Sequence, residues 1–408
     1  MLVNSDKNIN LHIVPDSKFI GPFILDIEAL SIDENHLFIA ISRWEDSESH
    51  FTFIDGKKVI YAPLDSESFK LTVGKLTRFK KIFIHWLLPN VESFVRSIPA
   101  GPLVCWCFWG EFDASFGPFS RYLRYENQSK EFALSSDINW RIITSQPLKL
   151  PYLPKFLRGG VRFFYSLIRW FKRVKSISRV DILLHWNEID LQLLRIANIS
   201  PFLKRHEFFY NVIDVTPSTN SDFVDKIWID HELDGKTVLL LGHSAFPSGN
   251  HLDALDEVKE KITDECLRII SFLSYGDSVY REVVIAKGRK LFGSRFIPIT
   301  TLLPVSEYYY LLSRISAAFL NHRYSEGAGN IFRILLEGKP LFLNPRSTIL
   351  KMLSVDGVKV YDASTALSLN NISYISLESK NNNLKYISNK FSHNASIKNL
   401  QAFFDANN

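Results

Sequence analysis

The chain has 408 residues, of which 46% are hydrophobic and 13% aromatic, so it can bury a substantial core and exceeds the length of one typical domain. We therefore expect two globular domains. Its 48 basic and 43 acidic residues give a net charge of +5, which is too mild to indicate a nucleic-acid partner by itself. The three cysteines, Cys105, Cys107 and Cys266, form neither a zinc-finger spacing nor a disulfide framework, and we expect all three to be buried.

No run of the sequence reaches the roughly 18 apolar residues that cross a bilayer. The first ten residues are too polar for a signal peptide. We therefore expect a protein that stays in the cytoplasm.

The first half of the chain alternates apolar runs with helical or loop stretches. We predict strands at 10–14, 37–43, 58–61, 81–86, 103–108 and 181–184. Strands that alternate with helices form a parallel sheet with doubly wound α/β topology. Residues 215–221 are polar and irregular, as in a linker, so we place the domain boundary between residues 222 and 223. The predicted domains are 1–222 and 223–408.

A basic window lies at 155–179, where eight Lys or Arg residues occur without an acidic one among large aromatic residues. We predict a helix at about 161–174. Basic and aromatic residues on one helix suit an anionic membrane surface, because aromatic rings enter the headgroup boundary while the cations stay outside. The alternative is a solvated basic face above an aromatic stripe that packs on the core.

The second half repeats the alternation. Predicted strands are 237–242, 267–274, 295–297, 317–321 and 340–343, and predicted helices are 253–265, 278–288, 306–313 and 330–337. Ligands of open parallel sheets bind beyond the carboxyl ends of the strands. The loops after these strands are therefore where we expect the site.

Those loops carry groups that suit a nucleotide sugar. Glycines allow close approach to a phosphate, and a helix start offers free N–H groups and a positive dipole end. Tyr275 is suited to a nucleobase, and His243, His251 and His322 to a diphosphate; Ser248 or Asn250 is a plausible N-cap of the next helix. The predicted donor-binding residues are Gly242, His243, Ser244, Ser248, Tyr275, Gly276, His322, Arg323, Glu326, Gly327, Gly329 and Asn330.

Each of these signals has a structural alternative. A Gly-x-Gly alone more often marks a plain tight turn, Tyr275 could cap the core, and a single histidine is more often structural than functional. Their convergence on strand ends of the same half favours the binding site.

Several ordered segments resemble glycosyltransferase family 56. These enzymes move 4-acetamido-4,6-dideoxygalactose from its TDP carrier to lipid II in the synthesis of enterobacterial common antigen. The resemblance covers about residues 11–346. It rests on 11–13 with Asp16, Lys18 and Phe19, on 83–86, on 106–110, on 241–244 with Ser248 and His251, on 273–276, and on 321–323 with 329–331 and 338–340.

The resemblance implies a GT-B architecture of two Rossmann-like domains facing across a cleft, the second holding the nucleotide sugar and the first the acceptor. It also implies catalysis without a metal or other cofactor, and the sequence has no convincing Asp-x-Asp at a strand end. Arg323 is our first choice for the diphosphate, because a guanidinium grips phosphate oxygens bidentately. Glu326 resembles a sugar-contacting glutamate, but Ile334 replaces the second glutamate of the familiar pair.

Two departures concern the site. The family's Arg-Gln-Gln is replaced by Arg323 followed by Tyr324, Ser325 and Glu326. The acidic residue after Trp109-Gly110 is displaced, so that either Glu111 or Asp113 takes its place.

A sugar transfer also needs a group that deprotonates or orients the acceptor hydroxyl. We predict Glu111, Asp113 or Asp16 as the catalytic carboxylate, with Glu111 and Asp113 favoured. The predicted acceptor-binding residues are His12, His85, Trp106 and Trp109, since indole rings stack on sugars. The alternative is a surface turn with tryptophans that simply pack in the core.

These features together predict a nucleotide-sugar-dependent glycosyltransferase of bacterial surface polysaccharide synthesis, peripheral on the inner face of the cell membrane, with a lipid-linked or oligosaccharide acceptor. The alternatives are a nucleotide-sugar-binding protein of the same fold without transfer activity, and a nucleotide-sugar epimerase or hydrolase. The sequence leaves open the donor sugar, the acceptor, the linkage and whether the anomeric configuration is inverted or retained.

Overall fold

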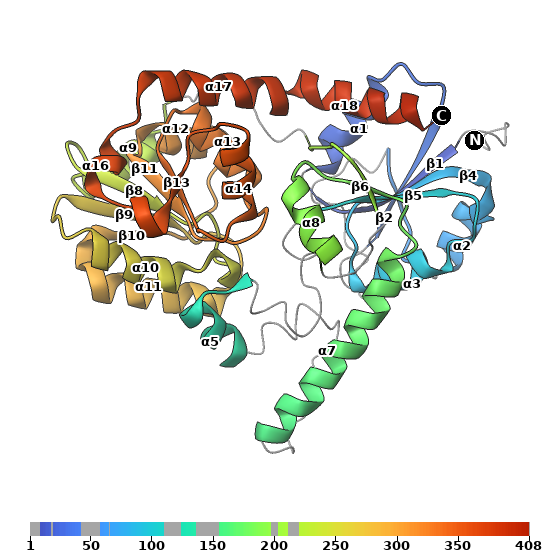
Figure 1. The fold of residues 1–408 in the computed structure, drawn as a ribbon, viewed down its shortest axis with the longest axis horizontal. Coiled ribbons are helices and arrows are strands. Elements are labelled where there is room, and N and C mark those ends of the chain that lie inside the picture. The colour runs from blue at the N-terminus through green and yellow to red at the C-terminus, as the bar shows by residue number, and fades with distance from the viewer. Residues whose placement is uncertain are drawn as a thin grey trace. The chain divides into compact units, whose positions relative to one another are not determined.

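The computed structural model describes residues 9–17, 19–41, 58–64, 66–109, 124–135, 155–196, 203–210 and 220–407. The chain divides into two compact units. Unit 1 comprises Met1–Ser120, Trp140–Val212 and His393–Asn408, and unit 2 comprises Arg121–Asn139 and Ile213–Ser392. Each unit is built on one parallel sheet with helices packed against it (Figure 1).

Unit 1 contains a seven-stranded sheet in the order β3-β2-β1-β4-β5-β6-β7. All neighbouring strands are parallel, and the chain reverses its direction of progress across the sheet between β1 and β4. Such a switch point is where open α/β sheets bind ligands. The strands are β1 (Ile9–Pro15), β2 (Asn35–Ile41), β3 (Ile60–Tyr61), β4 (Phe79–Ile84), β5 (Leu103–Cys107), β6 (Ile182–Leu184) and β7 (Lys204–His206).

The helices of unit 1 cover a core of buried aliphatic and aromatic side chains. This core includes Leu400, Phe403 and Phe404 from the last helix of the chain, α18, together with Phe23 and Ile24 from α1. The helices are α1 (Ile20–Glu28), α2 (Glu67–Val73), η1 (Leu76–Arg78), α3 (Pro89–Ser97), α7 (Lys155–Ile177), α8 (Glu188–Ile196) and α18 (His393–Ala406).

Unit 2 contains a six-stranded sheet in the order β10-β9-β8-β11-β12-β13. All its neighbouring pairs are parallel, and its switch point lies between β8 and β11. The strands are β8 (Thr237–Leu241), β9 (Leu267–Phe272), β10 (Phe296–Ile299), β11 (Ala317–Leu320), β12 (Leu341–Leu343) and β13 (Tyr361–Asp362).

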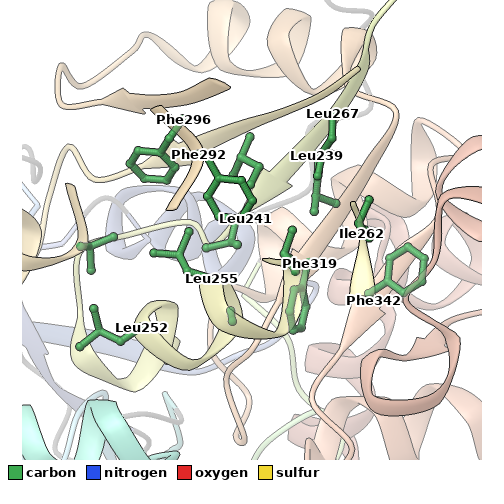
Figure 2. Close-up of a cluster of buried hydrophobic side chains, with 14 of the residues drawn as sticks. Leu239, Leu241, Leu252, Leu255, Ile262, Leu267, Phe292, Phe296, Phe319 and Phe342 are labelled. Carbon is green, nitrogen blue, oxygen red and sulfur yellow. The ribbon is translucent and has the colours of Figure 1, made fainter. Parts of the chain in front are cut away.

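One face of this second sheet packs on α10 and α11. Figure 2 shows Leu241 of β8 beside Leu255 of α10, in the same cluster as Leu239, Phe319 and Leu252. The helices of unit 2 are α5 (Asn127–Ser135), α9 (Asp222–Asp230), η2 (Pro247–Gly249), α10 (His251–Lys261), α11 (Ser278–Phe292), η3 (Gly293–Arg295), α12 (Val305–Arg314), α13 (Ala328–Leu336), α14 (Thr348–Val355), α15 (Ala363–Ala366), α16 (Leu369–Ser373) and α17 (Leu377–Phe391).

The predicted doubly wound α/β fold is confirmed, and the predicted strands agree with the observed ones to within a few residues. The grouping into units differs from the predicted division into 1–222 and 223–408: unit 2 begins at Ile213, takes in Arg121–Asn139 and ends at Ser392. The α5 segment joins unit 2, because Asp253 of α10 accepts hydrogen bonds from the backbone N–H groups of Gln128 and Ser129 at 2.8 and 3.0 Å. The α18 segment joins unit 1 through its buried phenylalanines.

Two smaller expectations were wrong. Cys266 is exposed, while Cys105 and Cys107 are buried as predicted. The basic window forms the longer helix α7, but its cations are not all solvated: Arg173 is buried, and its Nη1 lies 3.2 Å from Oε1 of Glu92 on α3. Arg169 also contacts this carboxylate oxygen, at 3.3 Å.

The opposite face of α7 is apolar and exposed. Phe164, Ile168 and Phe171 recur at helical spacing and are 66%, 54% and 58% exposed. The exposure of these three side chains is contrary to the alternative of a core-facing stripe that was considered for this window. Within the described ranges, no helix is both long and apolar enough to cross a membrane.

Candidate functional site

The carboxyl edge of the unit 2 sheet brings together most of the predicted donor-binding residues. Gly242 directly follows β8 with a φ of +74°, and its backbone N–H donates to the carbonyl of Phe319 in β11. A Cβ atom on Gly242 would lie 2.0 Å from Nε2 of His251, so the imidazole packs directly against this backbone. Only glycine satisfies both the conformation and the contact at this position.

Asn250 links three segments at this edge. Its Oδ1 accepts from the backbone N–H of Glu126 at 2.8 Å, and its Nδ2 donates to the carbonyls of Arg124 and Asn321 at 3.2 and 2.9 Å. Asn250 is the N-cap residue of α10, as predicted for Ser248 or Asn250, but it has left-handed backbone angles and its side chain makes no capping hydrogen bond. Instead, the hydroxyl of Tyr280 accepts from the N–H of His251.

The start of α13 is an uncapped helix N-terminus at this edge. Its N-cap, Gly327, has a φ of +63°, no side chain caps the helix, and no acidic residue lies in its first turn. The first N–H groups of α13 carry a partial positive charge, and no side chain of the helix's own first turn neutralises it. Gly329 and Asn330 lie in this first turn, as predicted.

His243 and His322 converge on the same helix start. A Cβ on Gly327 would lie 2.8 Å from Cε1 of His243, and the rings of His243 and His322 meet edge to face at 5.6 Å. Burial lowers the pKa of His243 to about 4 and that of His322 well below its usual value. Both rings are therefore neutral near pH 7, so toward a diphosphate they offer N–H donors and no positive charge.

Glu326 and Ser248 are also brought together. The Ser248 hydroxyl donates to Oε2 of Glu326 at 2.8 Å, and Nη2 of Arg124 lies 3.8 Å from Oε1. Both carboxylate oxygens thus have partners. Ser248 therefore positions the glutamate.

Arg323 forms an ion pair within unit 2 that its sequence context did not predict. Its Nε and Nη2 lie 2.8 and 2.6 Å from Oε1 of Glu126, and its side chain is 5% exposed. Asn344, which follows β12, donates to the same oxygen at 2.9 Å. Burial would raise the pKa of Glu126, but the hydrogen bonds from Asn344 and Arg323 outweigh it and lower the pKa. A diphosphate at Arg323 must therefore share it with this carboxylate.

Tyr275 lies after β9 and remains 46% exposed, so it does not cap the core. Its carbonyl accepts from the N–H of Ala245, and Gly276 forms a bridge with Ala245. Phe246 lies beside the tyrosine, with ring centroids 6.2 Å apart. These contacts join the loops after β8 and β9, next to Ser244.

The carboxyl edge of the unit 1 sheet is aromatic. Trp86 and Trp109, which follow β4 and β5, stack at 5.5 Å with an interplanar angle of 7°. Phe19 and Tyr210 meet the Trp109 ring edge-on, each at 5.3 Å. We call Phe19, Trp86, Trp109 and Tyr210 the aromatic platform.

The other predicted acceptor-binding and catalytic residues of the first half fall into three groups by their place in the structure. Trp106 and His12 are 0% exposed inside strands, which argues against direct contact with an acceptor. His85 is equally buried but follows β4, and Asp16 follows β1 at the switch point. Glu111 and Asp113 lie outside the described residues, so their predicted role stays a prediction.

Sequence reasoning missed several residues of these edges. Trp86 follows β4, so the rule that ligands bind beyond strand ends could have identified it. Tyr210 follows β7, whose sequence Lys-Arg-His does not predict a strand. The role of Glu126 could not be predicted from the sequence. The residue belongs to unit 2, although the segments before and after it in the sequence belong to unit 1.

Residues 211–390 match the model of a family described as 4-alpha-L-fucosyltransferase, glycosyl transferase group 56. No curated protein sequence shows a significant match. The structure is similar to Anabaena HepE in complex with UDP-glucose, with a TM-score of 0.58, 12% identity and coverage of 97% of this chain and 99% of that one.

Two further solved structures share the fold. A glycosyltransferase from Rickettsia africae has a TM-score of 0.57 and 9% identity, and covers 99% of both chains. The α,α-trehalose-phosphate synthase (UDP-forming) of Burkholderia vietnamiensis has a TM-score of 0.58 and 8% identity, and covers 98% of this chain and 99% of that one. The predicted family resemblance is thus confirmed over residues 211–390, as are the GT-B fold and the class of nucleotide-sugar-dependent glycosyltransferase.

The Gly242 contact can be tested against a matched glycine. Gly357 has nearly the same φ, +75°, but no atom within 4 Å of its added Cβ. Gly357→Ala should lower the free energy of unfolding by about 1 kcal/mol through backbone strain alone. Gly242→Ala should lower it by about 1–3 kcal/mol more, because the Cβ displaces His251. Urea unfolding of both variants measures the difference, and equal losses would contradict the packing account.

Proposed function

From the match of residues 211–390 to a glycosyltransferase family, we propose that this protein transfers a deoxyamino sugar from a nucleoside-diphosphate donor to a lipid-linked or oligosaccharide acceptor in bacterial surface polysaccharide synthesis. The observation that carries the donor side is the uncapped start of α13, where His243 and His322 converge. Similar folds in complex with UDP and UDP-glucose support a nucleotide sugar as the donor.

The donor diphosphate lies at the first turn of α13 in this proposal. The helix N–H groups and the neutral imidazoles donate hydrogen bonds to phosphate oxygens, while Arg323 supplies a full charge. Tyr275, exposed at the neighbouring loop, stacks on the nucleobase. As negative charge develops on the departing diphosphate, these preorganised donors stabilise it without a metal ion.

Arg323→Ala should weaken binding of a nucleoside diphosphate by about 1.5–3 kcal/mol, the usual range for a hydrogen bond to a charged group. Glu126→Gln is the matched variant, because it keeps the shape of the partner but removes the charge that competes for the guanidinium. This variant should bind the diphosphate at least as tightly as the wild type. Isothermal titration calorimetry measures both, and unchanged affinity of Arg323→Ala would remove Arg323 from the donor site.

Sugar transfer should persist in excess EDTA, because protein groups neutralise the diphosphate in this proposal. Product formation is followed by mass spectrometry with and without the chelator. Loss of turnover that added magnesium or manganese restores would reject the metal-independent mechanism.

We place the protein on the inner face of the cell membrane through α7. Phe164, Ile168 and Phe171 form an exposed apolar stripe, and the exposed cations Lys172 and Lys175 flank its end. Apolar side chains that enter the headgroup boundary beside cations that bind anionic headgroups are typical of an interfacial helix. Binding through α7 brings the enzyme to the surface that carries a lipid-linked acceptor.

Replacement of Phe164, Ile168 and Phe171 by Ser should abolish co-sedimentation with vesicles that contain phosphatidylglycerol, and Lys172→Glu with Lys175→Glu should weaken it at low salt. These positions avoid Arg169 and Arg173, whose replacement by Glu would place carboxylates against Glu92. Leu71→Ser, at another exposed apolar residue of unit 1, is the control. Equal sedimentation of wild type and variants, or none for either, would refute membrane docking by α7.

A further inference from the structure

A short segment ahead of α5, residues 124–126, lies against the turn that leads into α13. Nη2 of Arg124 lies 3.8 Å from Oε1 of Glu326, which directly precedes the N-cap of α13. Two residues further along the segment, Oε1 of Glu126 lies 2.8 and 2.6 Å from Nε and Nη2 of Arg323. Side chains of this segment therefore contact the turn at both residue 323 and residue 326.

The backbone of this segment is held firmly in unit 2. The side-chain amide of Asn250 hydrogen-bonds the carbonyl of Arg124 and the N–H of Glu126. Asp253 of α10 accepts from two backbone N–H groups in the first turn of α5. Glu126 is thus a built-in part of the carboxyl edge of the unit 2 sheet, although the chain before and after residues 121–139 belongs to unit 1.

Glu126 carries a negative charge into this edge. Burial would raise the pKa of its carboxyl, but hydrogen bonds from Asn344 and Arg323 and the charge of Arg346 lower it. The carboxylate is therefore ionised near pH 7. Its side chain is 24% exposed, whereas that of Arg323 is 5% exposed, so the charge of the pair that reaches solvent is the negative one.

The fixed charges at the turn before α13 are nearly balanced. Its two arginines and two glutamates form the two ion pairs described above, and their charges cancel. The histidines that converge on the helix start are neutral. Arg346, exposed after β12, adds one positive charge near Glu126. Much of the attraction for an anion at this turn must therefore come from the N–H groups of α13 rather than from a surplus of positive side chains.

The charge of a nucleotide sugar changes when its sugar is transferred. The diphosphate of the donor is esterified at both ends and carries two negative charges. Transfer breaks the bond between the sugar carbon and the terminal phosphate oxygen, which keeps the electron pair, while the acceptor hydroxyl loses its proton to solvent. The terminal phosphate becomes a monoester with a second pKa of about 6, so the product gains most of a third charge at pH 7.

We propose that Glu126 is a specificity-determining residue that weakens binding of the product nucleoside diphosphate relative to the donor. The inference rests on the proposed function, which places the diphosphate at Arg323 and the first turn of α13. A diphosphate that shares the Arg323 guanidinium with Glu126 lies close to this carboxylate. Two unit charges about 6 Å apart, at a dielectric between those of a protein surface and water, repel by the equivalent of about tenfold in affinity.

This repulsion has a use in turnover. Glu126 opposes part of the stabilisation that Arg323 and the α13 N–H groups give to the departing diphosphate. In return, the product with its extra charge leaves sooner. Product release limits the rate of many enzymes, so a carboxylate placed beside the diphosphate favours a faster cycle.

Ligands that differ only in charge test the proposal. UDP and its terminal methyl ester differ by the charge of the terminal phosphate and contain no sugar, and TDP with its methyl ester forms a second pair. By isothermal titration calorimetry, the wild type should bind the ester at least as tightly as the free diphosphate. Glu126→Gln should shift the ratio of the two dissociation constants about tenfold toward the free diphosphate. Glu126→Asp keeps the charge and should restore the wild-type preference.

Asp234→Asn is the matched control. Asp234 also pairs with an arginine, Arg314, at 3.2 Å, but it precedes β8 at the opposite edge of the same sheet. Its replacement should leave the ratio unchanged. An unchanged ratio in Glu126→Gln, an equal shift in Asp234→Asn, or a wild type that prefers the free diphosphate by tenfold or more would overturn this inference alone. A wild type that binds neither pair nor UDP-glucose would instead refute the proposed donor site, and with it the role of Glu126.

Discussion

The side-chain amide of Asn250 holds the carboxyl edge of the unit 2 sheet together. One residue in a left-handed conformation satisfies backbone groups of the Arg124–Glu126 segment and of the loop after β11. An unpaired backbone group at this buried place would cost about 1–3 kcal/mol, so these hydrogen bonds must form together. The segment before α5, the turn before α10 and the loop that leads to α13 are thereby fixed relative to one another.

The two sheets share their strand order apart from β7, the additional edge strand of unit 1, but they carry different chemistry at their switch points. In unit 2 the loops present backbone N–H groups, neutral imidazoles and the Arg323–Glu126 pair, which suits an anionic ligand. In unit 1 they present stacked indole rings and a tyrosine, which suits an apolar sugar face. The shared topology makes both edges candidate ligand sites, and the side chains indicate which kind of ligand each would suit.

The strands of unit 2 were predictable because they are short, continuous apolar runs such as Thr-Val-Leu-Leu-Leu of β8, which suit a sheet covered on both faces. The position of the candidate site in the loops after these strands was also predictable, because ligands of open parallel sheets bind beyond the carboxyl ends of the strands. The partner of Arg323 was not predictable, since Glu126 is separated from it by 197 residues. Trp106 shows the converse limit, because its sequence motif suggested a stacking surface, whereas it lies fully buried in β5, a strand that is covered on both faces.

The buried imidazoles also couple folding to protons. In the unfolded chain a histidine has an ordinary pKa of about 6.5, so it takes up a proton on mild acidification, whereas these rings in the folded protein resist it. The unfolded state then binds more protons, and stability is retained above about pH 6.5 and falls as the pH drops toward 4. Since seven rings contribute, stability should fall steeply with pH. The first loss of stability on mild acidification is therefore expected to come from these seven rings, which are His12, His36, His85, His206, His243, His251 and His322.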